Sequence, residues 1–278
     1  MPKKDIDHVV VRRGRTVNDK EVSIPVATDL TTVPGIPTRE SDVSFYSTNY
    51  PLETHNIEKT ADRDWIWTVY DEKLYKYLER HDELVDPLIE ASEGSAELEP
   101  ISIPEKRVDV TNQIREKARN LGFGEVGFTR YDYHYAFLAK KSWVQYEHVI
   151  CLAIEQDYIM TQSAPSLQAE QAHYGAYELE GALLLDLAEY IRGLGYHAQV
   201  HSPNDNSSVF IPMFVAAGLG QLGANGQLLS PHFGSRSRLA LLTTDAPLTH
   251  DDPVDYGINN FCKECQICVN RCPGRALV

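Results

Sequence analysis

The chain has 278 residues, of which 42% are hydrophobic and 24% charged, and its formal net charge is −14. This composition is typical of a globular protein with a sizeable core. The acidic balance argues against nucleic-acid binding, because phosphate contacts need a basic surface. The N-terminal residues include no apolar signal segment, and no run reaches the length of a membrane span, so the sequence predicts a cytoplasmic protein.

Residues 1–106 are expected to form an extended and helical arm followed by an acidic linker. Residues 1 to about 60 are polar, contain several prolines and show no hydrophobic period, which indicates an extended or partly disordered arm. Asp62 to Val85 has aromatic and apolar side chains at helical spacing, which predicts a helix. Residues 86–106 are acidic and contain prolines, and we interpret them as the linker.

An α/β domain is expected over residues 107–256, because helical and strand patterns alternate there. Helices are predicted at Val110–Leu121, Tyr177–Arg192 and Ser207–Ala217, and strands at Glu125–Arg130, His148–Ile154, Tyr196–Val200 and Leu239–Thr244. The helix over Tyr177–Arg192 has an apolar stripe of Leu179, Leu183, Leu187 and Ile191. Cys151, in an apolar run, is interpreted as a core residue. The histidines at 173, 197 and 201 are interpreted as surface or core residues.

A glycine-rich segment lies between the last predicted helix and the last predicted strand. Gly218, Gly220 and Gly223 match the dinucleotide fingerprint G-x-G-x-x-G. That fingerprint needs a strand before it and a helix after it, whereas here a helical pattern precedes it and turn residues follow. We therefore expect a loop whose bare backbone lies against a large flat ligand or against another segment of the chain.

Two tyrosines and two arginines are candidates for proton chemistry. Tyr174 and Tyr177 fall at the predicted start of a helix, where the positive end of the helix dipole favours a phenolate. Arg236 and Arg238 are two residues apart on an extended segment, so their side chains would point the same way. A cation beside a phenol helps it to release its proton. From these residues alone, buried tyrosines and surface arginines are the favoured interpretation.

Residues 257–278 contain a dense run of cysteines. Cys262, Cys265, Cys268 and Cys272, followed by Pro273, have the spacing C-x2-C-x2-C-x3-C-P of bacterial ferredoxins, which predicts a 4Fe-4S cluster. A zinc site is disfavoured because zinc ligands usually come as two separated pairs, and a disulfide pair is the other alternative. In two-cluster ferredoxins the fourth cysteine binds the other cluster. Either Cys272 closes a single cluster, or the sequence is truncated after the first cysteine run, which is the expectation we favour.

Several segments together resemble one superfamily. They are Y-E-L-E-G-A-L-L-L-D-L-A-E-Y-I-R-G-L-G-Y-H-A, S-P-N-D, A-A-G-L-G-Q-L-G-A-N-G-Q-L-L-S-P-H-F-G-S-R-S-R-L, T-T-D-A-P-L and the cysteine run, within residues 108–278. In order and spacing they resemble the cobalamin-dependent reductive dehalogenases and the related epoxyqueuosine reductases. The resemblance implies a nitroreductase-like layered α/β domain that holds a base-off cobalamin, followed by the start of a ferredoxin-like domain.

The resemblance also implies roles for individual residues. Tyr177 would donate the proton that replaces the halide, with Tyr174 in reserve, and Arg238 and Asn204 would lie beside it. The corrinoid would be contacted by Gly218, Gly220, Gly223, Asn225, Gly226 and Ser235. The iron–sulfur ligands would be Cys262, Cys265, Cys268 and Cys272.

The implied function is reductive dehalogenation of a small halogenated organic compound, often a halogenated phenol, with electrons from a ferredoxin, a flavodoxin or a reductase. Two alternatives stay open. The first is an epoxyqueuosine reductase acting on tRNA. Those enzymes resemble this chain but use an aspartate near this helix start, where the sequence here is H-Y-G-A-Y-E-L-E; Glu178 is the residue that could substitute. The second is a non-catalytic corrinoid-binding or electron-carrying protein.

Overall fold

The structure is a computed structural model of the chain. It describes residues 16–17, 20–21, 72–137, 140–163, 166–202 and 207–271. The chain forms two compact units, one of residues 1–78 with 137–139 and the other of residues 79–136 with 140–278. In the first unit, β1 (Thr16–Val17) and β2 (Lys20–Glu21) form an antiparallel pair. Most of the arm predicted over residues 1–60, and the start of the helix predicted from Asp62, lie outside the described residues.

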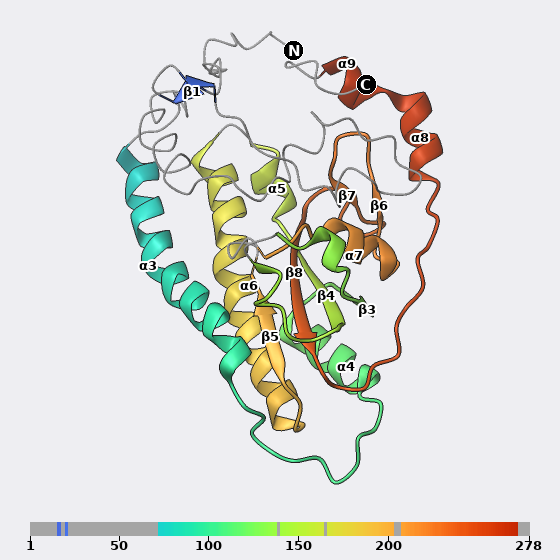
Figure 1. Cartoon of the computed structure of the whole chain (residues 1–278). Helices are drawn as coiled ribbons and strands as arrows, with labels where there is room; N and C mark the ends of the chain where they lie inside the picture. Colours follow the sequence, from blue (N-terminus) through green and yellow to red (C-terminus); the bar gives the residue numbers. More distant parts are fainter. Residues whose placement is uncertain are drawn as a thin grey trace. The chain divides into compact units, whose positions relative to one another are not determined.

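A four-stranded antiparallel sheet is the framework of the second unit (Figure 1). Its strands are β3 (Glu125–Arg130), β4 (His148–Glu155), β5 (Ala198–His201) and β8 (Ser237–Thr244), in the order β3-β4-β8-β5. The central strands β4 and β8 pair along their whole length, from His148 opposite Thr244 to Glu155 opposite Ser237. The predicted strands of this domain are confirmed, with shifts of one or two residues at their ends.

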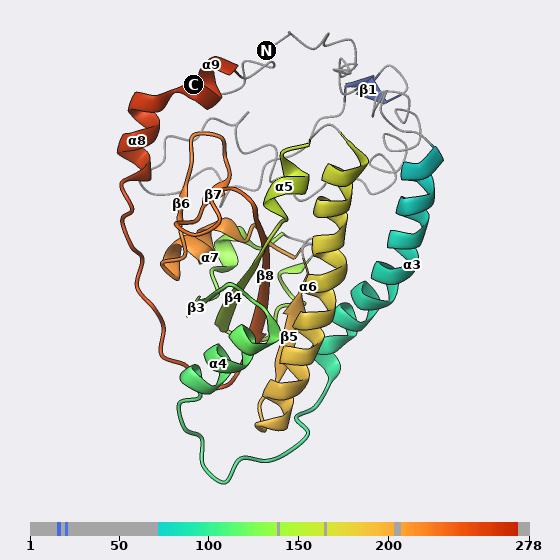
Figure 2. The ribbon, with the colours of Figure 1, turned by 180° about the vertical axis from the view of Figure 1, so that it is seen from behind.

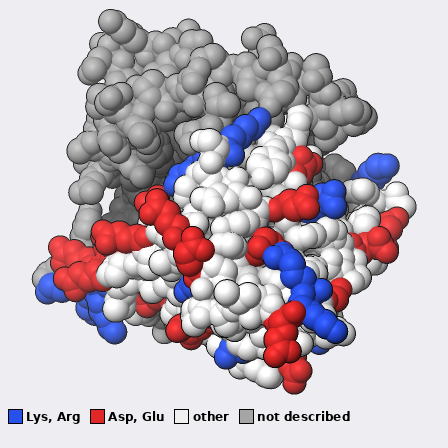
Figure 3. Space-filling view, turned by 60° about the horizontal axis from the view of Figure 1, so that its bottom comes forward, with Lys and Arg blue, Asp and Glu red and all other residues white. Residues whose placement is uncertain are grey.

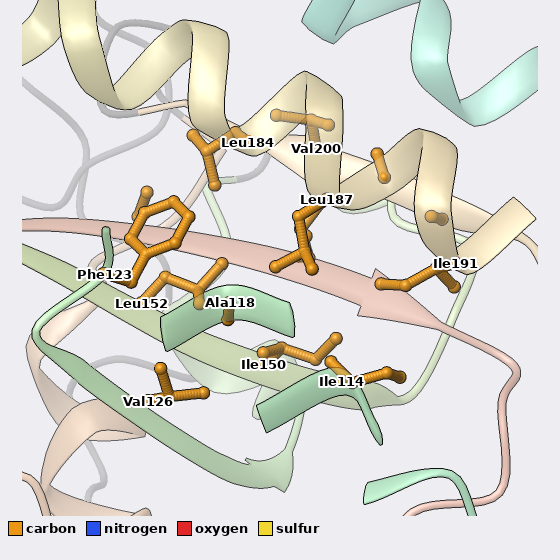
Figure 4. Packing of buried hydrophobic residues seen from close by; sticks show 14 of the residues in the cluster. Ile114, Ala118, Phe123, Val126, Ile150, Leu152, Leu184, Leu187, Ile191 and Val200 are labelled. Carbon is orange, nitrogen blue, oxygen red and sulfur yellow. The ribbon is translucent and has the colours of Figure 1, made fainter. Parts of the chain in front are cut away.

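Helices cover both faces of this sheet, because alternate residues of β4 are apolar on both sides. On one face, α4 (Thr111–Leu121) and α6 (Leu167–Gly193) pack on Ile150 and Leu152. Figure 4 shows their apolar side chains converging over β4. On the other face, α7 (Ile211–Ala216) packs on Val149 and Cys151, so the prediction that Cys151 is a core residue is confirmed. Figure 2 shows the same layers from behind. The layered α/β prediction is confirmed, while the domain boundaries at 107 and 257 stay predictions.

The linker predicted over residues 86–106 is wrong in its first part. Helix α3 (Glu72–Gly94) continues through Pro87, and a 3₁₀ turn, η3 (Ser95–Glu97), follows it. The reason is burial. His81, Val85 and Ser92 are buried at helical spacing, and Leu88 packs so closely on α6 that a Cβ on Gly181 would lie 2.9 Å from it. Packing of this face offsets the cost of an interior proline, about 3 kcal/mol.

Helix α6 begins well before its predicted start at Tyr177. Ser166 is its N-cap, and the Ser166 hydroxyl accepts a hydrogen bond from the Ala169 backbone N–H at 3.1 Å. The predicted stripe is also wrong in part, because Leu179 is 54% exposed. Glu180 lies on the buried face in its place. By contrast, the predicted end is confirmed: the helix ends at Gly193, and Gly195 has a positive φ of 91°.

The remaining elements are short. The 3₁₀ turn η4 (Tyr133–Tyr135) and helix α5 (Tyr158–Thr161) precede α6. Strands β6 (Gln221–Leu222) and β7 (Leu228–Leu229) form a hairpin after α7. Helices α8 (Ile258–Cys265) and α9 (Ile267–Arg271) carry the cysteine run. Within the described residues, none of the helices combines the length and the apolar character that crossing a bilayer would require.

Candidate functional site

A tyrosine and an arginine from different elements meet beside the sheet. Tyr177 lies within α6, and Arg238 lies near the start of β8, opposite Ile154 of β4. Nη1 of Arg238 donates a hydrogen bond of 2.6 Å to the Tyr177 hydroxyl. The guanidinium carbon lies 3.9 Å from the centre of the Tyr177 ring. Both side chains are half-buried, so the phenol is held by a cation in a partly dry environment, where such contacts are stronger than in water.

His173 is the second partner of the same guanidinium. Nη2 of Arg238 lies 2.9 Å from Nδ1 of His173, and since a guanidinium has only donors, this imidazole nitrogen accepts. Burial, together with electrostatic interactions with Arg238 and His81, lowers the pKa of His173 from 6.5 to about 4. At neutral pH His173 is therefore an uncharged acceptor that fixes one arm of Arg238 while the other arm holds Tyr177. The sequence interpretation of His173 as a surface or core residue missed this contact.

Helix α3 supplies the other wall around these tyrosines. Nδ1 of the buried His81 is 3.0 Å from Oε1 of Glu178. The His81 ring packs edge-on against Tyr174, with 4.8 Å between ring centres. Glu178, considered above as a substitute acid, is therefore engaged by α3.

One part of the sequence argument for these residues is wrong. Because α6 starts at Leu167, Tyr177 lies about three turns inside the helix, beyond the first turn in which the dipole acts. The two arginines also have different partners. Arg236 precedes β8, donates a hydrogen bond of 2.6 Å to Glu155 and lies over the Tyr158 ring at 4.7 Å. Only Arg238 reaches Tyr177.

Glu180 is a further acidic residue near this pair that sequence reasoning missed. It lies one turn after Tyr177 on the inner face of α6 and is completely buried. Its only signal in the sequence is an acid within the apolar stretch L-E-G-A-L-L-L.

The residues predicted to contact the corrinoid differ in the space around them. Gly218, Gly220 and Gly223 face other parts of the chain, because a Cβ on each would lie within 3 Å of neighbouring atoms. Gly226 has open space around it, and Ser235 is exposed. Asn225 accepts a hydrogen bond of 3.2 Å from the Gln227 backbone N–H in the turn between β6 and β7.

The glycine segment follows helix α7 and leads into the β6–β7 hairpin. The prediction that it lacks the strand–loop–helix context of a dinucleotide site is confirmed. It also holds the segment before the cysteines. Oε1 of Gln221 accepts hydrogen bonds from the backbone N–H groups of Tyr256, at 2.7 Å, and Ile258, at 3.2 Å. The Tyr256 hydroxyl donates to the Gly218 carbonyl at 2.7 Å. The glycine segment is therefore tied directly to the residues that begin α8.

The cysteine run provides free thiols of the kind that bind iron. Cys262 and Cys265 lie in α8 and Cys268 in α9, and all are free and partly or fully exposed. Between the helices, Gln266 has a φ of 50°, the one positive value for a non-glycine among the described residues. Within these residues no group of three His, Cys, Asp or Glu side chains is gathered around a metal position. The donor chemistry fits an iron–sulfur cluster. Asn204 and Cys272, predicted for the site and the cluster, lie outside the described residues.

No protein-family model matches the chain. Comparison with individual known proteins finds reductive dehalogenases and epoxyqueuosine reductases. A tetrachloroethene reductive dehalogenase of Desulfitobacterium hafniense is 35% identical over 130 residues, which cover 46% of this chain and 23% of that protein. One from Sulfurospirillum multivorans is 34% identical over 131 residues, 47% of this chain and 26% of that protein. An epoxyqueuosine reductase of Gloeobacter violaceus is 26% identical over 197 residues, 60% of each chain. The chain thus spans about a quarter of the length of these dehalogenases.

A solved structure extends the comparison to the fold. It is described as a reductive dehalogenase structure that suggests a mechanism for B12-dependent dehalogenation. It matches with a TM-score of 0.63 and 24% identity, over 71% of this chain and 30% of that one. The mixed α/β fold is therefore shared with that structure. In sequence and in fold the chain is similar to reductive dehalogenases.

Proposed function

We propose that this chain carries the proton-donating part of a reductive dehalogenase, which replaces a halogen of a small organic molecule with hydrogen. The contact between Arg238 and the Tyr177 hydroxyl carries the proposal, because it holds an acidic O–H against a fixed cation in a half-buried position. Support comes from the relatives, which are named for the dehalogenation of tetrachloroethene. We further propose that the substrate is a halogenated organic compound, such as a halophenol, and that the protein acts in the cytoplasm.

The reaction consumes two electrons and one proton for each carbon–halogen bond that is broken, and it releases one halide. A base-off cobalamin, which such enzymes use, would deliver the electrons, and iron–sulfur clusters would supply them from a ferredoxin, flavodoxin or reductase. In this chain Tyr177 would hold the proton at its hydroxyl oxygen and transfer it to the carbon that loses halide. Arg238 would orient the hydroxyl and stabilise the negative charge that remains on the phenol oxygen.

Residues elsewhere in the chain can be assigned to the two cofactors. Cys262, Cys265 and Cys268, with Cys272, would hold the iron–sulfur cluster. The open turn around Gly226 and the exposed Ser235 are the parts of the predicted corrinoid set that a flat ligand can reach. Gly218 and Gly220 would contribute to the corrinoid site indirectly. Their backbone packs against β7 and against the segment before α8, and so holds both in place.

An epoxyqueuosine reductase is the second candidate, and the 197-residue match to such an enzyme favours it. Its substrate would be a tRNA, and the net charge of −14 opposes binding to phosphates. On the described part of the face shown in Figure 3, acidic side chains are interspersed with basic ones and no continuous basic surface appears. These observations favour the small organic substrate. A non-catalytic corrinoid or electron carrier is the third candidate.

Anaerobic reconstitution tests these candidates. The chain is rebuilt with iron, sulfide and cobalamin and given a brominated phenol with a strong reductant. We expect bromide release that falls roughly 10²–10⁴-fold in Tyr177→Phe, the range of a general acid, without loss of bound corrinoid. Tyr158→Phe is the matched control, because the arginine over the Tyr158 ring is Arg236. Corrinoid binding without bromide release would support the carrier, and turnover of an epoxyqueuosine-containing tRNA would support the reductase.

A further inference from the structure

Glu180 is a buried carboxyl group without a hydrogen-bond partner among the described residues. Its exposed fraction is zero, and neither Oε1 nor Oε2 is hydrogen-bonded to any of them. It occupies a position on α6 between the apolar residues Ala176 and Leu184, which are also buried. Burying an unpaired polar group costs roughly 1–3 kcal/mol. Leucine or alanine would avoid this cost at the same position, so the fold carries a charge-bearing group that packing does not require.

Glu180 lies one turn from Tyr177 on α6, and the charge of Arg238 acts on it. His173, Tyr177 and Glu180 are spaced by four and then three residues on α6, so they lie along one side of the helix. Arg238 uses Nη1 for Tyr177 and Nη2 for His173, but its buried Nε has no hydrogen-bond partner in the part of the chain that the structure describes. A guanidinium with an unused donor thus lies near a carboxyl with unused acceptors.

The ionisation of Glu180 follows from this environment. Burial raises the pKa of Glu180 from 4.5 to about 8, and the positive charge of Arg238 opposes part of that rise. Other charged groups around α6 are already engaged: His81 of α3 binds Glu178, and Glu155 at the end of β4 binds Arg236. At neutral pH Glu180 is therefore mostly a neutral acid next to a cation.

We propose that Glu180 is a positioning residue for Arg238: as a neutral acid it leaves the guanidinium committed to Tyr177 and His173, and as a carboxylate it competes for that guanidinium through Nε. The protonation state of Glu180 then determines whether Arg238 stays hydrogen-bonded to the Tyr177 hydroxyl. No bond to substrate is involved, and the only exchange is of a proton with solvent. The effect on turnover rests on the proposed dehalogenase function, whereas the proton on Glu180 can be measured without any cofactor.

Infrared difference spectroscopy of the full chain, without cofactors, tests the first half. The carbonyl band of a protonated carboxylic acid should be present at neutral pH and should fade as pH rises through about 8. Glu180→Gln should remove this band, and its neutral, equally sized side chain should preserve the fold. Glu178→Gln is the matched control, because Glu178 is two residues away on α6 and paired with His81; it should leave the band in place.

The pH profile of bromide release by the reconstituted protein tests the second half. With a pKa of about 8, the neutral fraction of Glu180 falls about tenfold between pH 7 and pH 9. The rate should fall with it in the unaltered protein and in Glu178→Gln, but not in Glu180→Gln. Absence of the infrared band at neutral pH would overturn the inference while leaving the proposed function intact. A band that behaves as expected without bromide release in any variant would instead remove the proposed function, and identical pH profiles in all three proteins would remove the positioning role.

Discussion

Gly218 lies against the backbone of Asp252: a Cβ added at Gly218 would lie 2.5 Å from the Asp252 carbonyl oxygen. The φ of Gly218 is 69°, in the left-handed region that other residues avoid. The same stretch accepts the Tyr256 hydroxyl at the Gly218 carbonyl. The position therefore joins the glycine segment to the chain that leads to the cysteines, and it has room for no other residue.

Gly218→Ala is expected to destabilise the protein strongly. The left-handed conformation costs roughly 1–2 kcal/mol for alanine, and the close contact with backbone adds to this cost, since backbone cannot rotate away. Gly226→Ala is the control, because Gly226 has a similar φ of 76° but no atom within 4 Å of its Cβ. Denaturant unfolding should show a larger loss for Gly218→Ala, and equal losses would contradict the close contact. Weaker corrinoid binding by a folded Gly226→Ala would support the proposed role of that turn.

Local sequence patterns predicted the sheet better than the helices. The apolar run of β4 and the glycines that end α4 and α6 act over a few residues, so their interpretation did not depend on the rest of the fold. The start of α6 and the continuation of α3 through Pro87 depend on which faces the two helices bury against each other. Periodicity within a single segment does not contain that information.

The site was predicted unevenly for the same reason. The resemblance named Tyr177 and Arg238 together, and their side chains do meet. His173 and Glu180 were missed because their environment comes from β8, which is far away in the sequence. An acid on a helix is usually exposed and a histidine is intermediate in burial, and only the packing of α6 on the sheet shows that Glu180 is buried and His173 half-buried.

Glu180 should make the stability of the protein depend on pH on the alkaline side. Its pKa is about 8 in the folded protein against 4.5 for the free side chain, so the folded state holds the proton more tightly. The stabilisation is complete below about pH 4.5 and is lost as pH rises toward 8. Relative to Glu180→Gln, the unaltered protein should lose a few kcal/mol of unfolding free energy over this interval. Parallel stability curves for the two proteins would contradict this charge assignment.

His201 should produce the opposite dependence on the acid side. It is completely buried, with its ring nitrogens 3.0 Å from the hydroxyls of Ser207 and Thr243. Burial, with a smaller contribution from Lys140, lowers the pKa of His201 from 6.5 to about 3. The unfolded chain therefore binds a proton below pH 6.5 that the folded protein does not, and stability should fall as pH decreases from 6.5 toward 3.

The effect of His201 can be isolated by substitution. His201→Gln should be less stable at neutral pH, because it disturbs two buried hydrogen bonds, yet its unfolding free energy should decline less steeply on acidification. His232→Gln, at an exposed position, should retain the slope of the unaltered protein. If His201→Gln loses stability on acidification as steeply as the unaltered protein, then another group causes the acid dependence.

Arg238→Lys tests whether the geometry of the cation matters, beyond its charge. An ammonium group keeps the positive charge, but it lacks the planar fork that reaches Tyr177 and His173 at once. Bromide release by the reconstituted protein should fall by roughly 10²-fold, within the range of a mispositioned general acid. Arg236→Lys is the matched control, because Arg236 also lies over a tyrosine ring but binds Glu155.

If Arg238 acts through Tyr177, combining Arg238→Lys with Tyr177→Phe should give little further loss beyond Tyr177→Phe alone. Fully additive losses would show instead that the two residues act separately.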